Sequence, residues 1–154
     1  MKPYVVLGVY KPTLWKAYRV GRDICALTRK AGLIPHVDPA HGPLHGAAWF
    51  NEALHAECRK RTFKTKQAEG WHFDGDTTPG SKPSCCLVLW SSCSPTMIKW
   101  QEGEKEDQTV YVAKPFEVVL FRNDFCLHRR PPGCPRNRWT FRQRCAPVDI
   151  VNFY

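Results

Sequence analysis

The hydrophobic pattern of this chain changes at about residue 68 from helical to strand-like spacing, and this change constrains the fold most strongly. From there onward, short apolar segments alternate with turns rich in Gly, Pro, Asp and Ser. They predict eight strands, over residues 70–74, 86–91, 96–100, 109–113, 117–121, 125–128, 138–144 and 149–153. Eight short strands in about 85 residues indicate a two-layered β fold of the jelly-roll kind.

The first third of the chain predicts elements of a different kind. Residues 4–9 form an apolar run typical of a strand. Thr13 is a favourable N-cap for a helix that basic residues and Gly32 would end. A second helix is expected over residues 46–59, where apolar residues follow helical spacing. We expect both helices to pack against one sheet of the jelly-roll.

The size and composition fit one globular domain. A chain of 154 residues can bury enough surface to fold alone, and 43% hydrophobic residues provide a core. We therefore expect a single domain over residues 1–154, in which residues 1–67 supply a strand and two helices and residues 68–154 supply the β core. No apolar run approaches the ~18 residues of a membrane span, and no secretory signal pattern is present, so we expect an intracellular, cytoplasmic protein without membrane contact.

The charge balance favours an anionic partner or substrate, and no obligate protein partner is expected. Lysine and arginine number 23 against 14 aspartates and glutamates, which gives a formal net charge of +9. Residues 58–66 hold five of these cations, and Arg59, Lys60 and Arg61 are candidates for contacts with nucleic-acid phosphates. The alternative for this run is a solvated helix end and linker. Arg130 either lines the mouth of a site or lies in a solvated turn.

The cysteines and aromatic residues indicate a packed interior. The eight cysteines contain no C-x-x-C pair, which argues against a zinc ribbon or a disulfide framework, so we expect free and mostly buried thiols. Tryptophans, Trp15 and Trp139 among them, are expected in the core. Phe63 is the one aromatic residue within the basic run 58–66, so the sequence predicts no stacking platform for bases there.

A histidine and an aspartate lie on either side of one phenylalanine in a predicted strand. Since side chains alternate along a strand, His72 and Asp74 project from the same face and can bind one ion. They form half of a two-histidine, one-carboxylate site, and His128, at the end of a distant strand, is the candidate third ligand. Asp76 is a rival carboxylate, and Cys126 together with His72 would form a zinc site instead.

Two arginines share one face of the predicted strand that follows His128. A guanidinium inside a β core is costly unless it meets an anion, and a carboxylate that accepts two hydrogen bonds is the best match. A dicarboxylate bound between a metal ion and Arg138 or Arg142 would meet that need. Two histidines and one carboxylate leave about three positions of an octahedral Fe(II) open, enough for such a co-substrate and dioxygen.

These residues together resemble the H-x-D … H … R signature of the 2-oxoglutarate and Fe(II)-dependent dioxygenases, and the likeness covers residues 68–146. The resemblance implies a double-stranded β-helix, which is a jelly-roll of the cupin-like kind. It implies that His72, Asp74 and His128 bind iron and that 2-oxoglutarate chelates it.

The resemblance also implies how the co-substrate is held and what is made. Arg138 would pair with the distal carboxylate of 2-oxoglutarate, with Arg142 as a second contact or a substitute. Thr96 matches a position where some members place a hydroxyl on that carboxylate. The implied reaction decarboxylates 2-oxoglutarate to succinate and carbon dioxide while a C–H bond of the substrate is hydroxylated.

The substrate is left open by the sequence. The chain lacks the R-x-N-x-T-x-R string of the alkylated-base repair dioxygenases and carries arginine where collagen-type prolyl hydroxylases carry lysine. Nucleic acid, a peptide or protein side chain and a small molecule are therefore all candidate substrates, and the charge favours nucleic acid. The alternative to an enzyme is a catalytically silent, cupin-like binding module.

Overall fold

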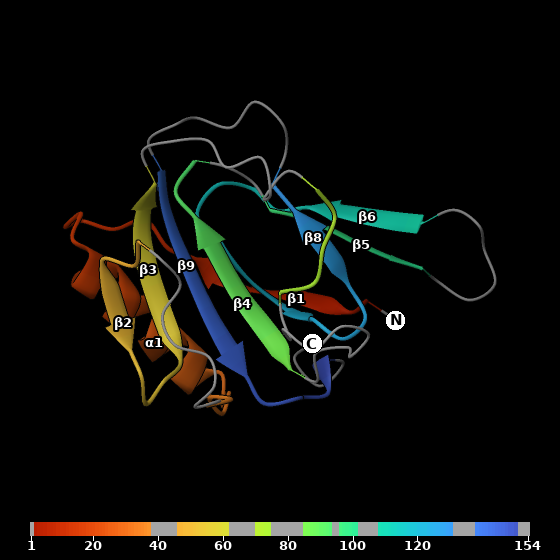
Figure 1. Ribbon diagram of the computed structural model, residues 1–154, viewed down its shortest axis with the longest axis horizontal. Coiled ribbons are helices and arrows are strands. Elements are labelled where there is room, and N and C mark those ends of the chain that lie inside the picture. Colours follow the sequence, from red (N-terminus) through yellow and green to blue (C-terminus); the bar gives the residue numbers. More distant parts are fainter. Residues whose placement is uncertain are drawn as a thin grey trace.

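The computed structural model describes residues 2–37, 46–61, 70–74, 85–93, 96–101, 108–130 and 138–150, with only the backbone of Arg61. In these residues the protein is mainly β, with one helix and two antiparallel sheets (Figure 1). The elements in chain order are β1 (Tyr4–Val9), α1 (Ala17–Lys30), β2 (Trp49–Asn51), β3 (Ala56–Arg61), β4 (Cys86–Ser91), β5 (Met97–Gln101), β6 (Gln108–Val112), β7 (Glu117–Arg122), β8 (Leu127–Arg129) and β9 (Arg138–Cys145).

The two sheets form the layers of a sandwich. The larger sheet has the strand order β1-β7-β4-β9-β3-β2, and the smaller has the order β6-β5-β8. Leu87 and Phe121 of the larger sheet share one buried cluster with Ile98 and Trp100 of the smaller sheet, so these faces pack against each other. A bridge between His72 and His128 adds the His72 segment beside β8 at the edge of the smaller sheet.

Helix α1 covers the outer face of the larger sheet, beside β2 and β3 (Figure 1). Its buried residues, including Val20 and Ile24, follow helical spacing and join a core cluster with Val88 and Phe141 of the sheet. The helix ends as expected, with basic residues in its last turn and Gly32 at φ +79° beyond it. It begins at Ala17, after the extended Lys16, which makes no side-chain cap, so the expected cap at Thr13 is wrong.

The expected second helix over residues 46–59 is wrong, because β2 and β3 form a hairpin there. Asn51 accepts a hydrogen bond from the Leu54 amide at 3.0 Å, and His55 takes φ +49°, which together close the turn. From Ala56 onward the side chains alternate between the two faces of the larger sheet. Strand β3 pairs with β9 along its whole length, and this long-range pairing outweighs the helical propensity of the local sequence.

Six of the eight strands predicted after residue 68 are present, with ends within two residues of those expected. Residues 70–74 form no regular strand, and they pair with the smaller sheet through a bridge at His72. Of the last predicted strand, Asp149 and Ile150 are not in a strand, and residues 151–153 lie outside the described part. Within the described residues, α1 is too short and too polar to cross a lipid bilayer.

Candidate metal centre

The two candidate histidine ligands are neighbours across the edge of the smaller sheet. The His72 amide donates to the His128 carbonyl at 3.1 Å, and the His128 amide donates to the His72 carbonyl at 3.0 Å. The side chains of two residues paired in this way project from the same face of the sheet, and the ring centroids of His72 and His128 are 4.4 Å apart. A backbone pairing between segments far apart in the sequence therefore sets the spacing of the two imidazoles.

Asp74 completes the group, because it lies two residues beyond His72 and points to the same side. Its Oδ1 is 3.3 Å from Nε2 of His72 and 3.4 Å from Nε2 of His128. The three ligand atoms lie within 4.8 Å of one another. Nitrogen and oxygen donors at this spacing can converge on one divalent cation.

Of the two rival ligands in the sequence, Cys126 does not join this group in the described structure. Cys126 is buried, and its thiol contacts the Pro3 carbonyl at 4.0 Å. Burial raises the pKa of the Cys126 thiol to about 12, which opposes the thiolate that zinc needs. Asp76 lies outside the described residues.

The backbone of Asp74 is held by a side chain that the sequence analysis missed. Asn123, fully buried in the turn after β7, accepts a hydrogen bond from the Asp74 amide at 3.2 Å and donates one to the Asp74 carbonyl. The main-chain amide of Asn123 donates to the Cys85 carbonyl at 3.1 Å. In the sequence, Asn123 is indistinguishable from an ordinary turn residue, and its role depends on the packing of the turn against residues 70–74.

His72 has a partner on its other ring nitrogen. Nδ1 lies 2.7 Å from the Gly70 carbonyl, which can only accept, so Nδ1 carries the hydrogen and Nε2 faces Asp74. The hydrogen bond to the Asp74 carboxylate raises the pKa of His72, burial opposes this rise, and the Gly70 carbonyl adds to it. A proton and a metal ion therefore compete for Nε2.

The second carboxylate oxygen of Asp74 belongs to a buried ion-pair chain. Arg142 Nη1 lies 3.0 Å from Asp74 Oδ2, and Arg142 Nε lies 3.2 Å from Oε1 of Glu57. Arg59 Nη2 approaches the same Glu57 oxygen at 3.2 Å. Burial alone would raise the pKa of Asp74, but hydrogen bonds from His128 and His72 and the charge of Arg142 hold it well below its usual range. Asp74 is thus kept ionised, with Oδ1 directed at the histidines.

The other expected site residues are also located within or beside the sandwich. Arg138 begins β9, is 1% exposed, and by strand alternation shares the inner face with Arg142. Arg130 follows β8 and is buried, which contradicts a solvated turn. Thr96 is half-buried directly before β5.

Of the three cations expected to contact phosphates at residues 59–61, Arg59 needs correction. Arg59 is buried and paired with Glu57 inside the sandwich, because β3 is a strand whose alternate residues point inward. Lys60 is exposed on the opposite face, with Nζ 5.9 Å from the ring centroid of Trp139. The side chain of Arg61 lies outside the described residues.

The cysteine prediction is confirmed for the described part of the chain. Its cysteines are all free, and all but Cys93 are buried. Burial raises the pKa of the thiols of Cys25, Cys58 and Cys145 to about 12. These thiols are protonated at neutral pH and are packing residues.

The comparisons with known proteins identify no relative: neither a scan against protein-family models nor a search of curated proteins found a match. Function is therefore argued from the site. The described residues offer two imidazole nitrogens, one carboxylate oxygen and a nearby face of buried arginines, which together suit a divalent metal and an anionic ligand.

Proposed function

We propose that the protein is a non-haem Fe(II) and 2-oxoglutarate-dependent oxygenase that hydroxylates a C–H bond. The observation that carries this proposal is the convergence of His72, Asp74 and His128 beside the inner, arginine-bearing face of β9. Two imidazoles and one carboxylate are the donor set of non-haem Fe(II) oxygenases, and they leave about three positions for co-substrate and dioxygen. Iron with 2-oxoglutarate and dioxygen would supply the oxidising chemistry that amino-acid side chains lack.

The strand order supports a jelly-roll of the double-stranded β-helix kind. Within the larger sheet β3, β9, β4 and β7 are successive neighbours, and within the smaller sheet the His72 segment, β8, β5 and β6 follow one another. Along the chain from β3 to β9, successive strands cross from one sheet to the other, except at the hairpin of β5 and β6. A jelly-roll consists of two packed sheets between which the chain alternates in this way.

The protein's own groups would hold and orient the metal. His72 is fixed by Gly70 with Nε2 toward the site, and Asn123 fixes the main chain of Asp74. Arg142 holds Oδ2 of Asp74, which leaves Oδ1 for the metal. Hydrogen-bonded outer residues of this kind orient metal ligands and tune their basicity.

By the resemblance in sequence, Arg138 is the first candidate anchor for the distal carboxylate of 2-oxoglutarate, with Arg142 as a second contact or a substitute. Arg142 also contacts Asp74 and Glu57, at 3.0 and 3.2 Å. Arg138 lies on the same inner face and is almost fully buried, where a bidentate carboxylate is the most favourable partner for a guanidinium. Thr96, half-buried before β5, would add a hydroxyl to the same carboxylate.

An anaerobic titration tests the proposal. Fe(II) is added first and 2-oxoglutarate second, and the visible charge-transfer band of the chelate is recorded. The wild type should develop the band, Asp74→Ala should not, and Arg138→Gln should require more 2-oxoglutarate. Asp124→Asn is the matched control, because this carboxylate pairs with Arg122 at the surface.

Two outcomes would contradict the oxygenase proposal: iron bound by the wild type with no band on adding 2-oxoglutarate, or an equal band in Asp74→Ala. The first would favour the silent binding module, and the second would show that Asp74 is not a ligand of the iron that binds 2-oxoglutarate. With the band established, succinate release is measured with oligonucleotides, peptides and small molecules in turn. The net charge of +9 favours the oligonucleotides.

A further inference from the structure

Three aromatic side chains from distant parts of the chain meet on the outer side of the larger sheet. Trp15 precedes α1, Phe116 lies in the turn before β7, and Trp139 is the second residue of β9. The ring centroid of Trp15 is 6.4 Å from that of Phe116 and 6.0 Å from that of Trp139. Trp15 is 42% exposed and the other two rings are half-buried, so part of this aromatic cluster faces solvent. The expectation that Trp15 belongs to the core is wrong.

The aromatic cluster packs against the buried ring of Trp90. Phe116 lies 6.2 Å from the ring of Trp90, which is 1% exposed. Trp90 in turn lies 5.9 Å from Tyr10, and its indole nitrogen donates to the Tyr10 carbonyl at 2.9 Å. Rings held in this way lose little conformational freedom when a flat ligand stacks on them.

Two exposed lysines border the cluster. Nζ of Lys11 lies 5.7 Å from the ring centroid of Phe116, and Nζ of Lys60 lies 5.9 Å from that of Trp139. Each ammonium contacts a ring face and is accessible from solvent. A ligand that stacks on the rings would therefore lie between two positive charges, Lys11 beside Phe116 and Lys60 beside Trp139.

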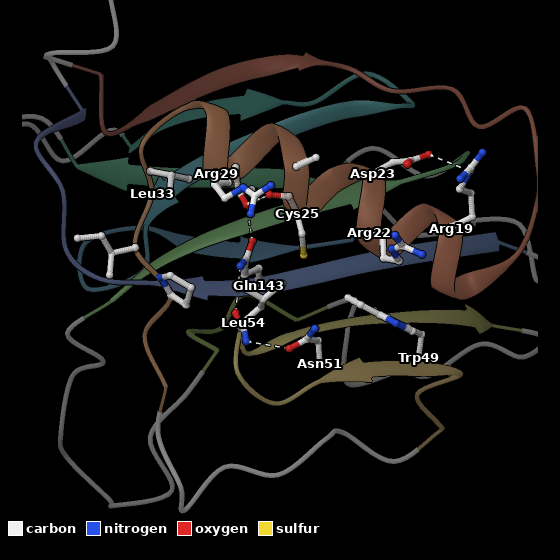
Figure 2. A pocket seen from close by; sticks show the side chains of 14 residues that line it. Arg19, Arg22, Asp23, Cys25, Arg29, Leu33, Trp49, Asn51, Leu54 and Gln143 are labelled. Carbon is white, nitrogen blue, oxygen red and sulfur yellow. Dashed lines mark hydrogen bonds and ion pairs between the residues drawn. The ribbon is translucent and has the colours of Figure 1, made fainter.

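The positive charge continues along α1. Arg19 and Arg22 line a groove of about 600 Å³ between α1 and the β2–β3 hairpin, together with Trp49 and Asn51 (Figure 2). Arg19 lies in the first turn of α1, four residues after Trp15. Asp23 neutralises part of this charge through a 3.8 Å contact with Arg19.

The aromatic cluster is separate from the candidate metal centre. Trp139 and Arg138 are successive residues of β9 and so lie on opposite faces of the larger sheet. Trp139 packs on the core cluster beneath α1, whereas Arg138 shares the inner face with Arg142. The aromatic cluster therefore has no part in holding the metal.

We propose that the surface formed by Trp15, Phe116 and Trp139, with Lys11 and Lys60, binds single-stranded nucleic acid. Unpaired bases stack on the rings, and the neighbouring phosphates face the lysines. A net charge of +9 complements a polyanion, whereas a proline-rich peptide would use the rings and leave the cations without a role. The inference goes beyond the proposed oxygenase function, since this binding requires no metal.

The experiment measures anisotropy of a labelled 12-nucleotide oligothymidine with the full chain in excess EDTA. Trp15→Ala should weaken binding by about tenfold, because one stacked base is lost, and Trp15→Phe should restore most of it. The double variant Lys11→Gln, Lys60→Gln should lower the slope of log affinity against log salt by about 0.7 for each lysine that contacts a phosphate. A duplex of the same length should bind more weakly.

The turn after β7 provides the matched control. Phe125 is 45% exposed and lies 5.6 Å from the Arg122 guanidinium, which is a similar pairing elsewhere on the surface. Phe125→Ala and Arg122→Gln should bind oligothymidine like the wild type, and circular dichroism verifies that every variant is folded. The proposal is overturned if folded Trp15→Ala binds normally, if Phe125→Ala loses as much affinity, or if a proline-rich peptide binds at Trp15 and oligothymidine does not. Because EDTA removes metal, these results are independent of the iron titration.

Discussion

Arg142 determines which oxygen of Asp74 faces the two histidines. It contacts Oδ2 at 3.0 Å while Oδ1 lies within 3.4 Å of both Nε2 atoms. Glu57, at 3.2 Å on the other side, keeps the guanidinium in position. The carboxylate is therefore oriented to bind a metal through Oδ1.

Replacement of Arg142 tests this orientation. Arg142→Gln should weaken metal affinity by about 10–100-fold, as loss of an outer-shell partner does, because Asp74 is then free to rotate. Competition with a chromophoric chelator measures the affinity. Arg122→Gln, which removes a surface ion pair with Asp124, should leave it unchanged. Equal affinity in Arg142→Gln and wild type would show that Arg142 does not position the ligand.

Single residues of the site differ in how far the sequence predicts them. His72 and Asp74 are expected on one face from strand alternation, and they do lie together although residues 70–74 form only a bridge; His128 follows from the need for a third donor on another strand. Asn123 and Glu57 do not, because an asparagine in a turn and a glutamate next to a basic segment are ordinary. Their roles arise only when β3, β9 and the turn after β7 come together.

At the scale of elements, Gly21 controls the contact between α1 and β2. A Cβ atom at this position would lie 2.3 Å from Cε3 of Trp49, so any larger residue requires the Trp49 ring or the helix to shift. The close packing of α1 on the β2–β3 hairpin therefore depends on the contact between Gly21 and Trp49.

Gly21→Ala should destabilise the protein by about 1–3 kcal/mol through overpacking, reduced by up to about 1 kcal/mol because alanine favours a helix. Urea unfolding gives the free energy. In the background of Trp49→Leu the same substitution should be neutral or stabilising, since the clash is removed. A gain in stability for Gly21→Ala alone would contradict the observed fit.

The local sequence predicts most elements but not the β2–β3 hairpin. The segments from β4 to β9 are short, mostly apolar runs bounded by turn residues, so six strands are predicted correctly. Residues 46–59 contain Ala, Leu and Glu, which favour a helix in isolation. Pairing of Ala56–Arg61 with β9 is a long-range interaction that no local pattern encodes.

At the scale of the whole molecule, the candidate metal centre joins both sheets. His72 and His128 belong to the edge of the smaller sheet, while Arg142 on β9 of the larger sheet holds Asp74. A metal bound there would stabilise the packing of one layer on the other, because the ligand geometry exists only in the folded chain.

Metal binding should therefore raise the melting temperature. At a free Fe(II) concentration about 100 times its dissociation constant, the stabilisation is about 2.7 kcal/mol, which for a chain of this size corresponds to about 5–10 °C. Differential scanning fluorimetry under anaerobic conditions measures the shift, and EDTA should reverse it. Asp74→Ala should show no rise; a similar rise in that variant would place the metal elsewhere.

The ion-pair chain of Glu57, Arg142 and Asp74 also bears on how such a protein can diverge. If Asp74 were lost during evolution, Glu57 would still contact both Arg142 and Arg59, and the backbone pairing of β9 with β3 and β4 would not be affected. The metal ligands and the architecture can therefore be inherited separately, so a descendant of this chain can lose the candidate metal centre and persist as a binding protein on the same scaffold.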